Sequence, residues 1–292
     1  MGLSEWNFVM EGKYKYIDTH AHLNLASFKD DREAVLARMR EESVAAISVG
    51  TKESTSKLAV EIAEANENCF AIVGLHPIQT VPSYHNEEEI GGKPFESKGE
   101  VFNKDFYREL AKHKKVVGIG ECGFDFWHTP KDSLAIQEAA FVAQIELANE
   151  LNLPLMIHTR GPKPGEESPT GRSVYEDVYE VLKKHAQVPF NVHFYAGTYE
   201  EAKKFFGIGG TISFTGVITF AKDYEEVVKK APLELIHAET DCPYVAPVPH
   251  RGKRCEPWMV MEVYKKIAEI RREDEEKVRE QLVGNANRLY QL

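Results

Sequence analysis

The sequence lacks the long apolar runs and leader segments that mark membrane or secreted proteins. No stretch approaches the roughly 18–20 apolar residues that are needed to cross a bilayer. The first residues have neither the basic region nor the apolar stretch of a secretory signal. Gly2 follows Met1, but Trp6 does not fit the Ser/Thr preference of a myristoylation site. We therefore expect no membrane association and a cytoplasmic location, or a nuclear one in a eukaryote.

Cysteine is scarce, and no two cysteines form a CxxC pair. The chain has four cysteines, at Cys69, Cys122, Cys242 and Cys255. This spacing argues against a zinc knuckle or a thioredoxin-type redox site. In a reducing compartment we expect all four to be free thiols that pack as small apolar side chains.

Positive charge is also in deficit, with 36 Lys and Arg against 46 Asp and Glu and a formal net charge of −10. A protein that grips nucleic acid by broad neutralisation of phosphates is usually basic, so this balance argues against a wide passive nucleic-acid surface. It leaves a phosphate-ester substrate open, because bound divalent cations can supply positive charge locally.

Two motifs of common enzyme classes are missing. The sequence contains no GxSxG nucleophile elbow and no Cys–His pairing that would suggest covalent catalysis. An open, doubly wound sheet usually has a glycine-rich phosphate loop after its first strand, whereas here the first predicted strand is followed by His-Ala-His.

What is present is an alternation of short β-branched or apolar runs with segments of helical period. We predict eight strands, at Tyr14–Thr19, Ala45–Gly50, Ala71–Leu75, Val116–Gly120, Pro154–His158, Phe190–Phe194, Thr211–Phe214 and Leu235–Thr240. We predict helices at Asp31–Glu42, Ser54–Asn66, Ser133–Leu151, Arg172–Ala186, Thr198–Phe206 and Asp223–Lys230, with two or three more in the tail Pro257–Leu292. This order predicts an α/β fold, a (β/α)8 TIM barrel. We find no linker, so we expect one domain over residues 1–292 that ends in C-terminal helices.

Two polar loops look inserted into this alternation. Residues 82–100 follow the third predicted strand, and residues 161–171 follow the fifth. Both would lie at the carboxyl face of the barrel, where substrate specificity is built, although a solvated surface loop explains them equally well.

Histidine and carboxylate residues stand at the ends of the predicted strands. His20 and His22 are two residues apart on an extended segment, so both imidazoles can point to the same side and share one metal ion. Because the carboxyl ends of barrel strands meet at one face, we expect six metal ligands to converge there. They are His20, His22, Glu121, His158, His193 and Asp241.

This ligand set predicts hydrolytic chemistry. It suits zinc, magnesium or manganese, as one or two divalent ions. We expect Glu121 to bridge two ions and Asp241 to accept a proton from the attacking water. Such a water can attack a phosphoryl or a carbonyl centre, so phosphodiester hydrolysis and the hydrolysis of an amide, lactone or small phosphoester remain open at this point.

Seven segments resemble motifs of the TatD family of metal-dependent deoxyribonucleases, in the amidohydrolase superfamily. They are Asp18–Leu23, Gly74–Pro77, Gly120–Asp125, Ile157–Arg160, Val192–Gly197, Glu239–Tyr244 and Ala246–Lys253. The resemblance covers nearly the whole chain and implies a TIM barrel that hydrolyses DNA, commonly from the 3′ end. One departure is the segment after the sixth strand, His-Phe-Tyr-Ala-Gly, where the family often has His-Cys-Phe followed by Ser or Thr and Gly.

The resemblance also implies roles for individual residues. The six predicted ligands fall on the family's metal-ligand positions. Five further residues fall in family motifs at the same face, where they would hold substrate phosphate: His76, Arg160, Tyr195, His250 and Arg251. The expected partner is DNA, single-stranded or at a 3′ end, and we expect a monomer.

Overall fold

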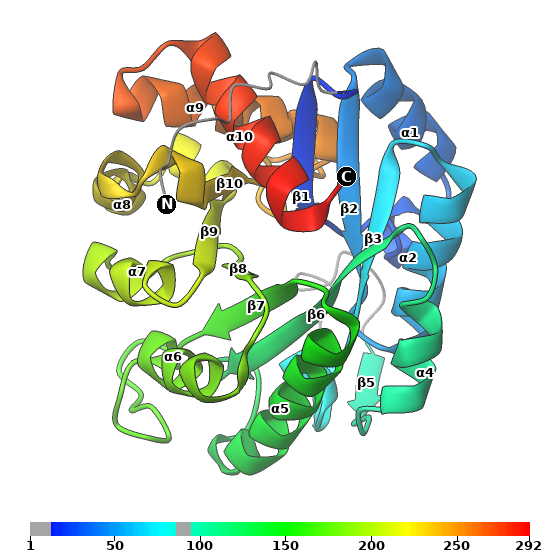
Figure 1. Cartoon of the computed structure of the whole chain (residues 1–292), viewed down its shortest axis with the longest axis vertical. Helices are drawn as coiled ribbons and strands as arrows, with labels where there is room; N and C mark the ends of the chain where they lie inside the picture. Colours follow the sequence, from blue (N-terminus) through cyan, green and yellow to red (C-terminus); the bar gives the residue numbers. More distant parts are fainter. Residues whose placement is uncertain (1–12, 86–94) are drawn as a thin grey trace, which may run out of the picture.

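The computed structural model describes residues 13–85 and 95–292. Eight parallel strands form the inner layer, in the order β1-β2-β3-β6-β7-β8-β9-β10. Their bounds are β1 Tyr16–Ala21, β2 Val44–Val49, β3 Cys69–Val73, β6 Val116–Asp125, β7 Leu155–Arg160, β8 Phe190–Val192, β9 Gly210–Phe214 and β10 Ile236–Ala238. Figure 1 shows these strands as a ring, which confirms the predicted (β/α)8 barrel.

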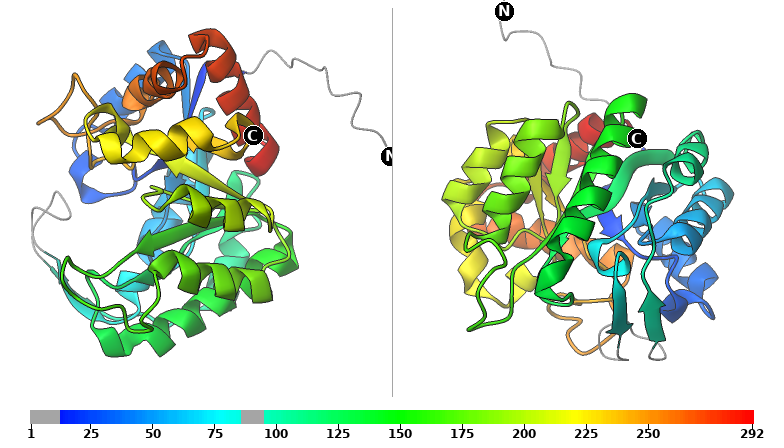
Figure 2. Two further views of the ribbon diagram at one scale, coloured as in Figure 1. Left: turned by 90° about the vertical axis from the view of Figure 1, so that its left-hand side faces the viewer. Right: turned by 90° about the horizontal axis from the view of Figure 1, so that it is seen from below.

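Helices form the outer layer around this ring (Figures 1 and 2). Their bounds are α1 Arg32–Glu41, α2 Glu53–Ala65, α4 Lys104–Leu110, α5 Leu134–Leu151, α6 Val174–His185, α7 Tyr199–Phe206, α8 Glu225–Lys230, α9 Val260–Arg271 and α10 Glu275–Tyr290. The larger apolar core lies between the two layers. None of the helices in the described part of the chain combines the length and the apolar character that a bilayer span requires.

The barrel closes where β1 meets β10, and this seam is made differently from the other strand pairs. The only backbone bridge assigned between the edges, within the described residues, joins Ala21 and Cys242. Asp18 adds side-chain bonds, since its carboxylate accepts from the backbone N–H and the hydroxyl of Thr240 at 2.9 and 2.6 Å. The seam therefore depends on buried polar contacts, which strengthen each other where water is excluded.

Helix α10 covers the amino-terminal end of the barrel. The side chain of Asn285 donates to the carbonyls of Leu233 and Ile236, at the start of β10. Leu289 and Tyr290 pack against apolar side chains inside the barrel. This end is consequently sealed, and the carboxyl ends of the strands are the face that can receive a substrate.

The predicted loop at 82–100 contains regular structure, so that expectation was wrong in part. Strands β4 Pro82–His85 and β5 Phe95–Lys98 pair as an antiparallel hairpin, while residues 86–94 lie outside the described residues. In Figure 2 the hairpin and the loop after β10 project from the same end of the barrel, away from the C-terminus. Residues 161–171 have no helix or strand, as predicted.

A short helix, α4, was not predicted. It spans seven residues, and only Tyr107 is buried among them. Asn103 caps it by accepting from the backbone N–H of Phe106 at 3.2 Å. Two turns with a single buried residue give almost no helical periodicity, which explains why the pattern of the sequence did not reveal it.

Candidate metal centre

The six predicted ligands meet at the carboxyl end of the barrel. They come from β1 and the residue after it (His20, His22), from β6 and β7 (Glu121, His158), and from the segments after β8 and β10 (His193, Asp241). Their side-chain atoms, together with His76, form three overlapping groups, each within 4.8 Å: His20 with Glu121 and His193, His20 with His22 and Asp241, and His76 with Glu121 and His158. The structure thus brings together residues that lie up to about two hundred positions apart.

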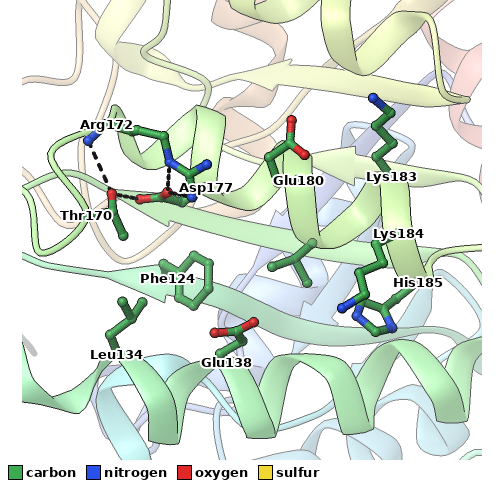
Figure 3. Close-up of a pocket in the computed structure, with 11 residues that line it drawn as sticks. Phe124, Leu134, Glu138, Thr170, Arg172, Asp177, Glu180, Lys183, Lys184 and His185 are labelled. Carbon is green, nitrogen blue, oxygen red and sulfur yellow. Dashed lines mark hydrogen bonds and ion pairs between the residues drawn. The ribbon is translucent and has the colours of Figure 1, made fainter.

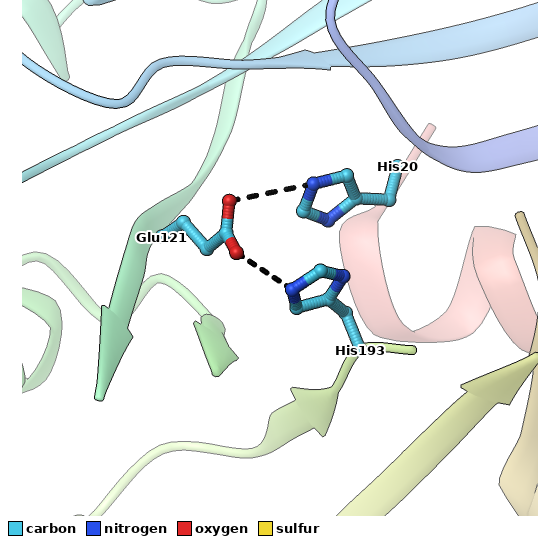
Figure 4. Close-up of side chains that lie close together, drawn as sticks. All are labelled: His20, Glu121 and His193. Carbon is cyan, nitrogen blue, oxygen red and sulfur yellow. Dashed lines mark ion pairs between the residues drawn. The ribbon is translucent and has the colours of Figure 1, made fainter. Parts of the chain in front are cut away.

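Glu121 lies at the centre of this cluster. One oxygen, Oε1, is 2.6 Å from His193 Nε2 and 2.8 Å from His158 Nδ1. The other, Oε2, is 3.5 Å from His20 Nε2. Figure 4 shows the carboxylate facing both the His20 and the His193 rings. Glu121 therefore contacts imidazoles from β1, from β7 and from the segment after β8, the arrangement expected of a bridging ligand.

A bulge in β6 aims Glu121 into the barrel. Gly120 pairs with Met156 and Cys122 pairs with Ile157, so Glu121 is the extra residue with no partner on β7. Bulges of this kind re-aim a side chain and often occur beside active sites. Gly120 has φ +144°, and a Cβ there would lie 2.5 Å from the Met156 carbonyl oxygen, so only glycine fits. Strand β6 also continues to Asp125, five residues beyond the predicted end.

The hydrogen bonds of His22 determine which of its nitrogens can bind a metal ion. Nδ1 lies 2.9 Å from the carbonyl oxygen of Val49, which can only accept, so Nδ1 carries the proton. Nε2 then presents a lone pair to Asp241 Oδ1 at 3.3 Å and to His20 Nε2 at 3.1 Å. This is the tautomer that a metal ligand requires.

His158 is oriented by a residue that the sequence analysis did not identify. Its Nε2 lies 3.0 Å from Asp125 Oδ2, and its Nδ1 faces Glu121. A histidine that donates one N–H to a carboxylate and turns the other nitrogen to the centre is the common arrangement of metal sites. Asp125 could have been found from the sequence, because residues 121, 123 and 125 alternate on one strand.

Positive charge is required among these atoms. Within the described part of the chain, every ion-pair partner of Glu121 and Asp241 is a histidine. Imidazole and carboxylate acceptors at such short separations need protons or metal cations between them. The donor set, borderline nitrogen and hard oxygen, fits divalent zinc, manganese or magnesium. The cluster can therefore hold metal, and none of the lysines or arginines that the structure describes competes for its carboxylates.

The pKa shifts reflect the same crowding of opposite charges. Burial alone would raise the pKa of Glu121, but the surrounding histidines hold it well below its usual range. Burial alone would lower the pKa of His193, but Glu121 beside it raises that pKa well above the ordinary value. His158 responds in the same direction, because Asp125 and Glu121 outweigh its burial and raise its pKa. These three groups behave as one coupled unit.

His76 joins the cluster but has the opposite tautomer. Its Nδ1 accepts from the backbone N–H of Ile78 at 3.1 Å, so the proton of the neutral ring lies on Nε2. Nε2 is 3.4 Å from Glu121 Oε1 and 3.1 Å from His158 Nδ1. Burial lowers the pKa of His76 to about 4, which keeps the ring neutral near pH 7. His76 is thus arranged as a hydrogen-bond donor inside the site rather than as a ligand.

Three of the other predicted substrate-binding residues, Arg160, Arg251 and His250, each pack against an aromatic ring. Arg160 lies on β7 two residues after His158, and its guanidinium sits 4.8 Å from the centre of the Trp127 ring. Arg251 stacks on Phe220 at 4.1 Å, and its Nη1 donates to the Ala246 carbonyl. His250 packs edge-on against Trp258 at 5.0 Å.

Tyr195 is the exception among these predictions. Its ring is buried against Tyr175, and its hydroxyl donates to the Thr198 carbonyl at 2.6 Å. The side chain is 1% exposed, so the hydroxyl cannot reach a substrate. The structure gives Tyr195 a packing role, which corrects the expectation that it holds phosphate.

A separate surface pocket of about 440 Å³ lies between α5 and α6 (Figure 3). Phe124 and Val181 contribute apolar surface to its lining. At one end, Asp177 accepts from Thr170 and pairs with Arg172 at 2.7 Å. The pocket shares no residue with the metal cluster, and its buried carboxylate is already neutralised, so nothing in it suggests hydrolytic chemistry.

The chain matches known proteins over nearly its whole length. The family described as TatD related DNase matches residues 17–291. An uncharacterized metal-dependent hydrolase, YabD of Bacillus subtilis, is 35% identical over 280 residues, with 94% of this chain and 98% of that protein covered. The 3′-5′ ssDNA/RNA exonuclease TatD of Pantoea ananatis is 31% identical over 286 residues, with 94% and 99% covered.

Solved structures show the same fold. YjjV, a TatD homologue from Escherichia coli, has a TM-score of 0.78 at 23% identity and covers 96% of this chain and 100% of its own. A TatD family hydrolase from Entamoeba histolytica has a TM-score of 0.75 at 21% identity, with 95% and 98% covered. Together with the family match and the ligand cluster, these similarities lead to one conclusion: the chain belongs to the TatD family of metal-dependent hydrolases.

Proposed function

We propose that this hydrolase cleaves phosphodiester bonds in single-stranded nucleic acid, DNA first, as a 3′-5′ exonuclease. The observation that carries the proposal is the pair Arg160 and Trp127 beside the metal cluster. Arg160 follows the ligand His158 by two residues on β7, and its guanidinium lies over the Trp127 indole. One cationic fork and one aromatic face side by side suit a phosphate and its adjacent unpaired base. An amide or lactone needs neither group.

The ligand set proposed for one or two zinc, magnesium or manganese ions is His20, His22, Glu121, His158, His193 and Asp241. Bound divalent ions lower the pKa of water and polarise a phosphoryl oxygen. In this assignment Glu121 would contribute to both ion sites, since it contacts proposed ligands on both sides of the cluster. Asp241, whose side chain is 14% exposed, would be placed to accept a proton from the attacking water.

His76 has a different part in this proposal. Its Nε2–H points at the cluster, so the nitrogen that faces the cluster offers a proton rather than a lone pair. It is placed to donate to a substrate oxygen that gains negative charge during the reaction. A fixed donor of this kind acts chiefly on the transition state.

The exonuclease named among the relatives supports this choice of substrate, as does the acidic net charge of the chain. With a net charge of −10, the protein gains little from binding long stretches of duplex backbone. Contacts confined to the site favour an end or a short single-stranded segment.

The test compares chelator-treated protein with the same sample reloaded with Mn²⁺ or Mg²⁺. The substrates are 5′-labelled single-stranded DNA with a free or a blocked 3′ end, the matching duplex, and a chromogenic lactone and amide. We expect a ladder that shortens from the free 3′ end only after reloading. Cleavage of the lactone or amide with intact DNA would overturn the nuclease assignment and keep the hydrolase. Nuclease activity that survives complete chelation, and that a Glu121→Ala protein retains, would overturn the mechanism.

A further inference from the structure

The interior of the barrel beneath the metal cluster is divided into an apolar and a polar half. The side chains from β2, β3, β6 and β7 are apolar: Ile47, Val49, Ile72, Val117 and Met156. The side chains from β8, β9 and β10 are polar, although all are buried: Asn191, Thr211, Ser213 and His237. Barrel interiors are dominated by branched apolar residues, and buried polar groups are costly unless they are hydrogen-bonded. The polar half therefore calls for an explanation.

These polar side chains form one chain of hydrogen bonds that ends on Glu239, just after β10. The Ser213 hydroxyl donates to Glu239 Oε2 at 2.6 Å. Asn191 Nδ2 donates to the Ser213 oxygen at 2.8 Å. Thr211 Oγ1 lies 3.1 Å from Asn191 Oδ1, and His237 Nε2 lies 3.1 Å from Thr211 Oγ1. The chain thus runs from the lower interior of the barrel to the edge of the metal cluster.

The donors of Asn191 and Ser213 both point towards Glu239. Thr211 has one hydroxyl proton, and the oxygens of Phe190 and Asn191 beside it can only accept, so that proton is committed to one of them. His237 must then donate from Nε2 to the Thr211 oxygen. A chain of hydrogen bonds with one direction polarises each member and strengthens the next.

Glu239 is consequently held at both oxygens. Oε2 accepts from Ser213, and Oε1 accepts from the backbone N–H of Phe194 at 2.6 Å. The residue is fully buried, so water cannot replace either donor. Glu239 also lies beside the ring of His193, with Oε1 3.6 Å from His193 Nδ1. This nitrogen has no hydrogen-bond partner among the described residues.

The other contacts of His193 do not fix which of its ring nitrogens carries the proton. Its Nε2 faces Glu121 at 2.6 Å, and its ring stacks on His20 with centroids 3.9 Å apart and an interplanar angle of 13°. Stacking limits the tilt of the ring, but it does not decide which nitrogen carries the proton. A carboxylate beside Nδ1 favours the proton on that nitrogen and leaves the Nε2 lone pair facing the cluster.

We propose that Glu239, held by the Asn191–Ser213 chain, is a positioning residue that keeps His193 Nε2 turned to the cation site with its lone pair free. This inference rests on the ligand set proposed above but not on the choice of substrate. The polar half of the barrel interior then serves the metal centre rather than the fold alone.

The test measures Mn²⁺ affinity by calorimetry and the tautomer of His193 by long-range ¹H–¹⁵N NMR of the metal-free protein, at an alkaline pH where the ring is neutral. The variants are Ser213→Ala, which frees one Glu239 oxygen, and Glu239→Gln, which keeps the shape. We expect the dissociation constant to rise roughly 10- to 100-fold in both, as for other residues that orient a metal-binding histidine. We also expect the His193 spectrum to show protonation shifting from Nδ1 towards Nε2.

Two further proteins serve as controls. Thr211→Ser keeps the hydroxyl of the chain and should bind Mn²⁺ as the wild type does. Thr19→Val removes a buried strand hydroxyl whose hydrogen-bond partner among the described residues is the Ala238 carbonyl, outside the hydrogen-bond chain, and should also leave affinity unchanged.

A His193→Ala protein distinguishes failure of the proposed positioning role of Glu239 from failure of the proposed ligand set. If His193→Ala loses affinity while Ser213→Ala and Glu239→Gln bind Mn²⁺ normally with an unchanged tautomer, the positioning role is wrong and the ligand set stands. If His193→Ala itself binds Mn²⁺ as tightly as the wild type, the ligand set is wrong and the inference falls with it.

Discussion

Asp125 accepts a hydrogen bond from His158 Nε2 at 3.0 Å, and the same carboxylate accepts from the Trp127 and His128 backbone N–H groups at 2.9 and 2.8 Å. The carboxylate is almost completely buried, so its orientation is fixed from several sides. It joins the chemistry of the cluster to the loop that carries Trp127. Asp125 therefore links the proposed metal ligand His158 and the proposed substrate contact Trp127 through one side chain.

Replacing this carboxylate by an amide should weaken metal binding. In Asp125→Asn the amide oxygen can keep the loop contacts, but the amide nitrogen then faces His158 Nε2 and favours the wrong tautomer. We expect the Mn²⁺ dissociation constant to rise roughly 10- to 100-fold with little change in secondary structure. Calorimetry and circular dichroism measure the two quantities. Wild-type affinity in this variant would show that Asp125 does not orient His158.

Removing His76 should slow turnover without releasing metal. His76→Ala takes away a donor, and loss of one fixed donor to a developing negative charge typically lowers kcat by about 10²- to 10³-fold. Mn²⁺ affinity should stay within about twofold, because the Nε2 of His76 carries a proton. His113→Ala is a matched control, since that histidine pairs with Glu64 on the surface. A large loss of Mn²⁺ affinity in His76→Ala would instead make His76 a ligand.

The Trp127 ring should matter only for nucleic-acid substrates. Base stacking on an aromatic side chain contributes about 1–3 kcal/mol, so Trp127→Ala should raise KM for single-stranded DNA by roughly 5- to 150-fold. Hydrolysis of a small chromogenic phosphodiester, which has no adjacent base, should be unchanged. Tyr199→Ala on α7 removes a comparable lysine-stacked ring and should affect neither substrate. Equal losses on both substrates in Trp127→Ala would indicate a disturbed site rather than lost stacking.

Divalent metal should stabilise the fold. An ion that binds only the folded state at one hundred times its dissociation constant adds about 2.7 kcal/mol to the free energy of unfolding. For a chain of this size each kcal/mol raises Tm by about 2–4 °C, so Mn²⁺ should raise the melting temperature by at least about 5 °C. Thermal melts with chelator and with Mn²⁺ measure the shift. Glu121→Ala should show almost none of it, and a full shift in that variant would place the stabilising metal elsewhere.

His237 should make the protein less stable in acid. Burial lowers its folded-state pKa to about 3, against about 6.5 in the unfolded chain, so the unfolded state binds the proton first as the pH falls. The contribution of His237 to the free energy of unfolding is complete above pH about 6.5. As the pH falls below this value, the free energy of unfolding decreases by up to about 1.4 kcal/mol per pH unit, and the decrease levels off near pH 3. Urea unfolding of wild type and His237→Gln in chelator, from pH 7.5 to 4.5, tests this. Parallel pH profiles for the two proteins would exclude His237 as a source of acid sensitivity.

Much of the fold could be predicted because barrel strands and helices leave strong periodic patterns. The errors lie where the backbone departs from regular geometry. Strand β1 was placed two residues too early, and β6 was ended at Gly120, at the bulge that interrupts its alternation. A bulge depends on pairing with a neighbouring strand, which no local pattern encodes. The hairpin β4–β5 was missed for the same reason.

The candidate site was predictable to the extent that its residues follow strands. His20, Glu121 and Asp241 converge because the barrel brings strand ends together, a consequence of topology alone. The orientation of each ring was not predictable, since it depends on partners such as Val49 and Asp125 that lie on other segments. Tyr195 lies in a family motif, but its hydroxyl bonds the Thr198 carbonyl, because a motif position does not determine where a side chain points.

The seam between β1 and β10 has a consequence for how activity is acquired. His20 and His22 stand on one edge of the seam and Asp241 on the other, and contacts there join positions 222 residues apart. Contacts between such distant segments form late, because the intervening chain must first be ordered. A cation held by these three residues can therefore bind firmly only after the two ends of the barrel have joined. Partly synthesised or locally opened molecules would lack the complete cage, so the proposed water activation would be confined to chains whose folding has finished.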